Sequence, residues 1–216
     1  MNHTVVRTLI VVFVLALSAC SPATSSTGGA ATQSAGGSGA RPFAATPPAQ
    51  RNGQPAAMPA MSIDAAKQYN ATIHTVQGDI VVKLRADKAP QTVNNFVTLS
   101  RQGYYDSLTF HRVENQPGFQ LIQGGDPLGT GAGGPGYTVP AEIGLPHTAG
   151  AIAMARKGDQ VNPTKASSGS QFYICLVPIP QLDAGYTVFG EVTSGQDVAK
   201  QIKRGDQIQK IDISEQ

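Results

Sequence analysis

Short β-rich runs separated by turn residues constrain the fold of this chain more than any other feature. They recur at close spacing from residue 71 to residue 213 and contain many branched and aromatic side chains. Two segments instead place apolar residues at helical spacing, one from Pro90 to Gly103 and one over 196–203. Many short strands with few helices are typical of an antiparallel β-barrel. The expected strands cover residues 71–76, 79–84, 108–113, 119–123, 149–155, 171–177, 187–192 and 208–213.

The segment that precedes these strands has a different composition. Residues 21–66 consist mostly of Gly, Ser, Ala, Thr, Pro and Gln and contain few large apolar side chains. Such a stretch buries too little surface to offset the entropy lost on ordering, so we expect a disordered linker. Residues 67–216 suffice for one hydrophobic core. The sequence therefore predicts a single folded domain over 67–216 behind a linker.

The first twenty residues have the layout of an export signal. Arg7 precedes an apolar run over residues 9–17, and small residues follow. The run is too short to span a membrane comfortably. Leu17-Ser18-Ala19-Cys20 resembles the lipobox of bacterial lipoproteins, in which the cysteine is lipidated. This resemblance implies an exported protein anchored to the bacterial cell membrane through Cys20; the alternative is a plain secretory signal in which Cys20 has no such role.

The charge distribution argues against broad capture of nucleic acid. The chain has 16 basic and 14 acidic residues, and no acidic residue precedes Asp64. From Asp64 onward the two signs are nearly balanced. A nearly neutral domain does not attract a polyanion through its overall field, so we expect no nucleic-acid partner.

The usual catalytic constellations do not occur in the sequence. His74, His111 and His147 are far apart and lack the spacing of metal ligands, so we expect no metal and no cofactor. The Gly-rich segment 124–136 lacks the Lys-Ser/Thr ending of a phosphate-binding loop. Cys175 lies in an apolar run, which is typical of a buried core residue. Neither a covalent nor a metal-dependent mechanism is indicated.

Six short motifs, each weak by itself, occur in a fixed order that resembles a known family. They are Phe110-His111-Arg112-Val113, Pro117-Gly118-Phe119, Gln123-Gly124-Gly125-Asp126, Ala153-Met154-Ala155, Ser168-Gly169-Ser170-Gln171-Phe172-Tyr173-Ile174 and Val188-Phe189-Gly190. Together they resemble the cyclophilin-type peptidyl-prolyl cis-trans isomerases, here in a bacterial lipoprotein form, over about residues 69–213. The resemblance implies a mainly β fold, an eight-stranded antiparallel closed β-barrel capped by two α-helices.

The resemblance also implies an activity, the acceleration of rotation about X–Pro peptide bonds. That rotation has a barrier of about 18–20 kcal/mol because the amide bond has partial double-bond character. The enzyme needs no covalent bond to its substrate, since it has only to stabilise the twisted amide better than the planar one. By resemblance Arg112 is the catalytic cation, which donates a hydrogen bond toward the amide nitrogen or orients the prolyl carbonyl.

Matching the motifs residue by residue implies a substrate-binding groove around Arg112. The apolar pocket for the proline ring would consist of Phe119, Met154, Tyr173 and Leu182. Gln123 and Gln171 would form hydrogen bonds to substrate backbone or to Arg112. The backbone of Ala155 and Arg156 would bind the residue before proline, and Tyr186 would lie near the proline ring.

The chain departs from the family pattern at three places. Extra residues after the Phe-His-Arg motif leave open whether Phe119 or Leu121 lines the pocket. Gln181 stands where many eukaryotic members have Trp, which puts tight binding of cyclosporin in doubt. Arg156 and Lys157 replace the usual Asn-Ala and add positive charge, which predicts tolerance of acidic residues next to the proline.

These observations favour a monomeric, exported, lipid-anchored prolyl isomerase that acts on proline-containing polypeptides and assists protein folding outside the cytoplasm. A non-catalytic peptide-binding module or chaperone on the same barrel would share every pocket residue and lack turnover. A purely structural surface lipoprotein is a third hypothesis. The presence of Arg112 favours catalysis over both.

Overall fold

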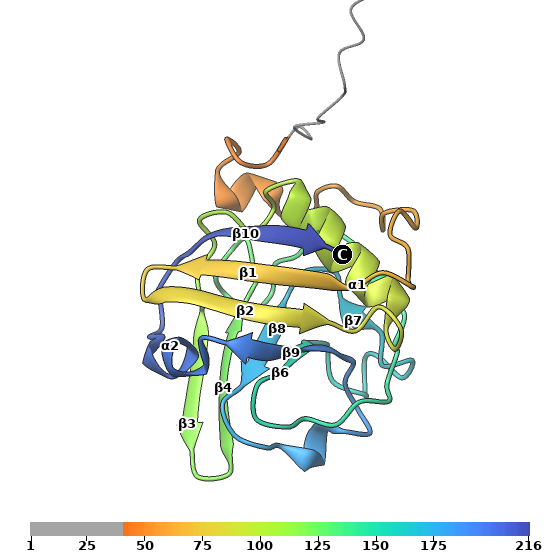
Figure 1. Cartoon of the computed structure of the whole chain (residues 1–216). Helices are drawn as coiled ribbons and strands as arrows, with labels where there is room; N and C mark the ends of the chain where they lie inside the picture. Colours follow the sequence, from red (N-terminus) through yellow and green to blue (C-terminus); the bar gives the residue numbers. More distant parts are fainter. Residues whose placement is uncertain (1–40) are drawn as a thin grey trace, which may run out of the picture. The chain divides into compact units, whose positions relative to one another are not determined.

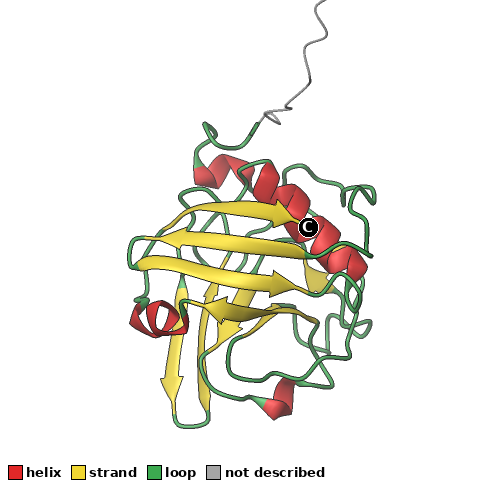
Figure 2. Cartoon of the chain, viewed as in Figure 1, coloured by secondary structure: helices red, strands yellow, loops and turns green. Residues whose placement is uncertain are grey.

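The computed structural model describes residues 41–216, which form one antiparallel sheet with helices beside it (Figures 1 and 2). The eight strands follow the order β10-β1-β2-β9-β6-β8-β4-β3. Their bounds are β1 Tyr69–Thr75, β2 Gly78–Leu84, β3 Arg112–Gln116, β4 Phe119–Gly124, β6 Ala151–Met154, β8 Phe172–Cys175, β9 Val188–Ser194 and β10 Ile208–Glu215. A separate two-stranded sheet pairs β5 (Thr138–Val139) with β7 (Ser167–Ser168).

Two α-helices and two 3-10 helices complete the fold. They are α1 (Pro90–Arg101), α2 (Gln196–Gln201), η1 (Pro48–Arg51) and η2 (Pro180–Leu182). The helix α1 lies beside β10, whereas α2 lies beside β2 (Figure 1). Pro90 occupies the first turn of α1, where its missing N–H is not needed. Phe96 of this helix contacts the rings of Phe172 and Phe189 at centroid distances of 5.6 and 5.1 Å, which joins α1 to the main core.

The expected fold class is confirmed as a mainly β domain with eight antiparallel strands and two α-helices. The sheet curls as a half-barrel, in which the edge strands β3 and β10 are not neighbours in the strand order. The chain just ahead of β3 meets the chain at the start of β10 instead. Phe110 N–H donates to Asp206 O at 2.9 Å, and Ile208 N–H donates to Leu108 O at 2.7 Å.

The strand expected over residues 108–113 is therefore wrong over its first part, because β3 begins only at Arg112. Ser107 has a positive φ of 63°, which turns the chain, and Thr109 forms only isolated bridges. The late start places Arg112 at the end of a regular ladder, directly opposite Gln123 of β4. The remaining expected strands and both helices appear with shifted ends.

Residues 41–66, expected within a disordered linker, are described in the structure, and their first part packs against the domain. Arg51 is 1% exposed. Its Nε donates to Thr46 O at 2.8 Å, and its Nη1 donates to Tyr104 O at 2.9 Å and also to Asp106 O. The disordered-linker prediction is thus wrong for this part, because a few side chains among many small ones supply the contacts.

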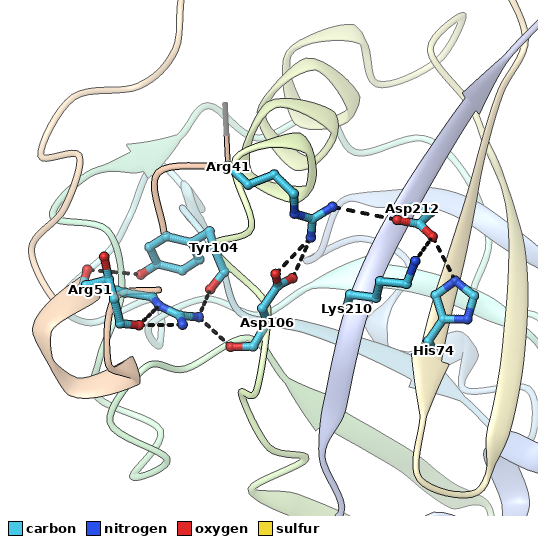
Figure 3. A network of polar contacts seen from close by, with 8 residues as sticks. Arg41, Arg51, His74, Tyr104, Asp106, Lys210 and Asp212 are labelled. Atoms are coloured by element: carbon cyan, nitrogen blue, oxygen red, sulfur yellow. Dashed lines mark hydrogen bonds and ion pairs between the residues drawn. The ribbon is translucent and has the colours of Figure 1, made fainter. Parts of the chain in front are cut away.

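The same segment makes an apolar contact next to Arg51 and also ionic contacts, which Figure 3 shows. The Phe43 ring meets the Tyr104 ring edge to face at a centroid distance of 5.4 Å. Arg41 Nη2 donates to both carboxylate oxygens of Asp106, at 2.7 and 2.9 Å, and Arg41 Nη1 lies 3.6 Å from Asp212 Oδ1. We call residues 41–56 the N-terminal strap, since they run along the domain as one packed segment.

The expectations for the extreme N-terminus fall outside the described residues. These are the signal peptide over 1–20, lipidation of Cys20 and the linker over 21–40. Within residues 41–216 the helices are too short or too polar to cross a membrane.

Candidate active site

A solvent-open cavity of about 120 Å³ lies where β4, β6 and β8 meet η2. Ligand pockets for drug-sized molecules are roughly 300–1,000 Å³, so this cavity fits a small group such as one ring. It is lined by Arg112, Phe119, Leu121, Gln123, Ala155, Arg156, Tyr173, Leu182 and Tyr186. Eight of the ten residues predicted for the substrate site are among them.

A second cavity of about 170 Å³ is larger but contains none of the predicted site residues. Its lining includes Arg85, Leu145, Thr148, Val188 and Glu191. The smaller cavity is the better candidate, because it contains eight of the ten predicted site residues and the larger one contains none.

The open choice between Phe119 and Leu121 is answered by strand alternation. Residues i and i+2 of a strand face the same side, and both side chains line the cavity together with Gln123 further along β4. The extra residues after Arg112 lengthen the β3–β4 hairpin, which Figure 1 shows at the edge of the sheet.

Alternation also explains why the prediction for Met154 is wrong. Met154 is completely buried and belongs with Ile152 to the main core cluster. Ala153 faces the other way, into the smaller cluster that underlies the cavity. Matching motifs identified the segment correctly but not the face on which each side chain lies.

Arg112 is held at the rim of the cavity by two neighbours. Its Nε donates to Glu114 Oε1 at 2.9 Å, and its Nη1 donates to Gln123 Oε1 at 3.2 Å. The side chain remains 46% exposed. Because a guanidinium carries five N–H groups, donors are left over that can reach a bound peptide. Glu114 was missed in the sequence, although its place two residues after Arg112 puts it on the same face of β3.

A relay of amides fixes the acceptor that Arg112 uses. Gln171 Nε2 donates to Gly131 O and Gly133 O, each at 2.9 Å. Its Oε1 must therefore face Gln123, whose Nε2 donates to it at 2.9 Å. Gln123 is left with only its oxygen to offer Arg112. Gln171 thus lies behind the cavity and acts on Arg112 through Gln123.

Gln171 bonds the Gly-rich loop of residues 124–136, and the N-terminal strap forms backbone hydrogen bonds to the same loop. Gly53 N–H donates to Gly134 O at 2.8 Å, and Ala56 N–H donates to Pro135 O at 2.9 Å. From inside, the buried Asp126 accepts the backbone N–H of Leu128 at 2.8 Å. No motif or periodicity in the sequence indicated this contribution of the strap.

One family model matches most of this chain. Residues 70–215 match the family described as cyclophilin type peptidyl-prolyl cis-trans isomerase/CLD. The chain belongs to the cyclophilin family. Its enzyme class is therefore peptidyl-prolyl cis-trans isomerase.

Individual cyclophilins resemble the chain over most of their own length. A peptidyl-prolyl cis-trans isomerase of Helicobacter pylori is 44% identical over 156 residues, which are 70% of this chain and 90% of that protein. Peptidyl-prolyl cis-trans isomerase B of Bacillus subtilis is 48% identical over 137 residues, 62% of this chain and 90% of that one. A crystal structure of a Cryptosporidium parvum cyclophilin has a TM-score of 0.60 and 32% identity, and the match covers 68% of this chain and 98% of that one.

The backbone of this cyclophilin next to the cavity differs from the expectation at Ala155. Its N–H donates to Gln171 O at 2.9 Å, and its carbonyl accepts Ser168 N–H at 2.7 Å. The N–H of Ala155 is thus already used inside the domain. Within residues 41–216 the backbone of Arg156 makes no hydrogen bond, so Arg156 is the better candidate to pair with substrate backbone.

The charge that Arg156 brings to the groove is largely compensated. Its guanidinium lies 4.5 Å above the ring of Tyr186, and its Nη1 pairs with Asp159. Its Nε donates to Gly185 O. Since Arg112 is also paired, with Glu114, we now expect only a small preference for acidic residues beside the proline.

Two buried histidines predict how stability depends on pH. Burial lowers the pKa of His111 and the pKa of His147 below the ordinary value. The folded state then stays neutral where the unfolded chain binds protons, below about pH 6.5. The free energy of unfolding should therefore fall as the pH drops from 6.5, by up to about 1.4 kcal/mol per pH unit for each histidine.

Urea unfolding at several pH values between 5.5 and 7.5 measures this slope. The window lies above the range in which carboxylates titrate, so the histidines dominate it. A His147→Gln variant should show a shallower slope than the wild type. Equal slopes in the two proteins would contradict the assignment.

Proposed function

We propose that this protein is an exported, lipid-anchored prolyl isomerase that uses Arg112 to stabilise the twisted X–Pro amide of polypeptides bound in the cavity. The observation that carries the proposal is a guanidinium with spare donors at the rim of a cavity that is sized for one ring and has Phe119 and Leu121 in its lining. The enzyme class follows from the family; the role of Arg112 and the location are the proposed part.

Twisting the amide changes what its atoms can accept. In the planar form the nitrogen lone pair is delocalised into the carbonyl, whereas in the twisted form it is localised on nitrogen. A donor aimed at that nitrogen is therefore bound more strongly in the transition state than in the ground state. Arg112 is suited to this role because Glu114 and Gln123 fix its orientation beforehand.

The apolar side chains of the cavity would hold the proline ring. Phe119, Leu121, Leu182 and Tyr186 pack around Tyr173 in one cluster. Gripping the ring lets the enzyme rotate the flanking peptide against a fixed point, which Arg112 alone cannot do. A further crystal structure of the Cryptosporidium parvum cyclophilin was determined in the presence of the dipeptide Ala-Pro, which supports a prolyl substrate for this fold.

Turnover separates this proposal from a peptide-binding module or chaperone on the same fold. The test is the rate of cis-to-trans exchange of an Ala-Pro peptide, measured in a protease-coupled assay. An enhancement that depends on Arg112 supports the proposal. Binding of the peptide without faster exchange would support the non-catalytic alternative instead.

Membrane attachment rests on the sequence of the first twenty residues. Acyl chains contribute about 0.8 kcal/mol per buried CH₂, so several chains on one cysteine can hold a protein at a membrane. We expect the full chain in the membrane fraction of a bacterial host and a Cys20→Ser variant in the soluble fraction. Cys175→Ser is the matched control, because Cys175 is buried and should not affect location. A Cys20→Ser protein that stays in the membrane fraction would rule out the lipid anchor.

A further inference from the structure

One buried histidine joins two walls of the cavity without lining it. His147 precedes β6 and is 2% exposed. Its Nδ1 lies 2.8 Å from Asp183 Oδ1, and its Nε2 lies 2.9 Å from the hydroxyl oxygen of Tyr173. Asp183 directly follows Leu182, a cavity residue of η2, and Tyr173 is the cavity residue of β8.

The proton positions follow from the partners. A carboxylate only accepts, so Nδ1 of His147 carries the proton that Asp183 receives. The bare Nε2 then accepts the O–H of Tyr173. Burial is the main cause that lowers the pKa of His147, which keeps the ring in this neutral form.

Backbone hydrogen bonds also join His147 to the residues that flank η2. His147 N–H donates to Asp183 Oδ1 at 2.7 Å, and Ile179 N–H donates to the His147 carbonyl at 2.9 Å. His147 is therefore bonded to the residues just before and just after η2. Its Nε2 alone makes the hydrogen bond to Tyr173 of β8. The imidazole and the Tyr173 ring are nearly parallel, with centroids 6.0 Å apart and an angle of 11° between the planes.

The hydroxyl of Tyr173 needs such a partner. Tyr173 is 3% exposed, and a buried hydroxyl without a hydrogen bond costs free energy. With its O–H turned to His147, the tyrosine can present its ring to the cavity and keep its polar atom away from the apolar cluster.

We propose that His147 is a positioning residue for the proline site, which holds the Tyr173 ring and the Leu182 wall at a fixed separation through its two ring nitrogens. This inference rests on the proposed use of the cavity as the proline site. His147 lines no part of the cavity, so its effect must pass through the link that it forms between Tyr173 and η2. That requirement makes the proposal testable by coupling.

The experiment is a double-mutant cycle on the full-length protein, read as the KM and kcat for an Ala-Pro peptide. His147→Phe fills a similar volume but removes both ring hydrogen bonds, and Tyr173→Phe removes only the hydroxyl. Each single variant should raise KM about three- to tenfold, the range expected from one lost hydrogen bond. In the Tyr173→Phe background, His147→Phe should change KM less than about twofold further.

Effects that multiply in the double variant would overturn the proposal, as would a His147→Phe protein with unchanged KM. If His147→Phe does not fold, His147→Gln and Tyr173→Phe form the cycle instead. His74→Gln is the control, since His74 lies on β1 far along the sheet from β8 and pairs with Asp79. It should leave KM unchanged.

Two further arms separate this inference from the proposed function. If Arg112→Ala lowers kcat/KM but the His147 and Tyr173 effects multiply, only the inference fails. If the wild type shows no turnover, the proposed function fails, and the same cycle is read on the Kd of the peptide. Coupling in Kd would still support His147 as a positioning residue, and its absence would refute it.

Discussion

Replacing Arg112 with Ala should lower kcat/KM for an Ala-Pro peptide about 10- to 100-fold. A hydrogen bond from a charged donor contributes about 1.5–3 kcal/mol, and each 1.36 kcal/mol lost from the transition state costs tenfold in rate. The remaining acceleration would come from the grip of the apolar cluster on the ring. The protease-coupled assay measures the effect directly. KM should change much less than kcat, since the bond forms mainly with the twisted amide.

Arg101→Ala is a closely matched control for this prediction. Arg101 is 45% exposed and pairs with Glu215 at 2.8 Å, whereas Arg112 is 46% exposed and pairs with Glu114 at 2.9 Å. The two arginines thus differ mainly in the cavity beside Arg112. Arg101→Ala should leave kcat/KM unchanged. An Arg112→Ala enzyme as fast as the wild type, or an equal loss in both variants, would refute the mechanism.

Most of the predicted site residues line one cavity because strand alternation and motif order carry most of its geometry. Arg112 and Gln123 come from motifs in adjacent strands, and antiparallel pairing sets them directly opposite each other. Motif matching cannot say which face a side chain takes, and Met154 shows the resulting error. His147 lies in no motif, so its contact with Tyr173 became visible only in three dimensions.

The strap was missed for a different reason. The composition of a segment is an average over many residues, whereas packing depends on single side chains. Phe43 and Arg51 are separated by small and polar residues, yet each reaches the turn that follows α1. A buried arginine bonded to backbone carbonyls has no signature in composition, because its partners are present in every sequence.

Replacing Arg51 with Met should destabilise the domain by about 3 kcal/mol or more. The substitution keeps part of the apolar stem but leaves the carbonyls of Thr46, Tyr104 and Asp106 without their charged donor. In a domain of this size that loss lowers Tm by roughly 6–12 °C. Arg41→Ala is the matched control, because Arg41 is 32% exposed and its ion pair with Asp106 should contribute less than about 1 kcal/mol.

Removing the strap altogether extends the same argument from stability to catalysis. A fragment of residues 57–216 should melt below a fragment of residues 41–216, since it lacks Arg51 and the bonds to the Gly-rich loop. That loop supplies the carbonyls that orient Gln171, and Gln171 orients Gln123 under Arg112. The shorter fragment should therefore also lose kcat/KM at temperatures where it remains folded. Equal Tm values for the two fragments would show that the strap contributes nothing, whereas a lower Tm with unchanged kcat/KM would confine its role to stability.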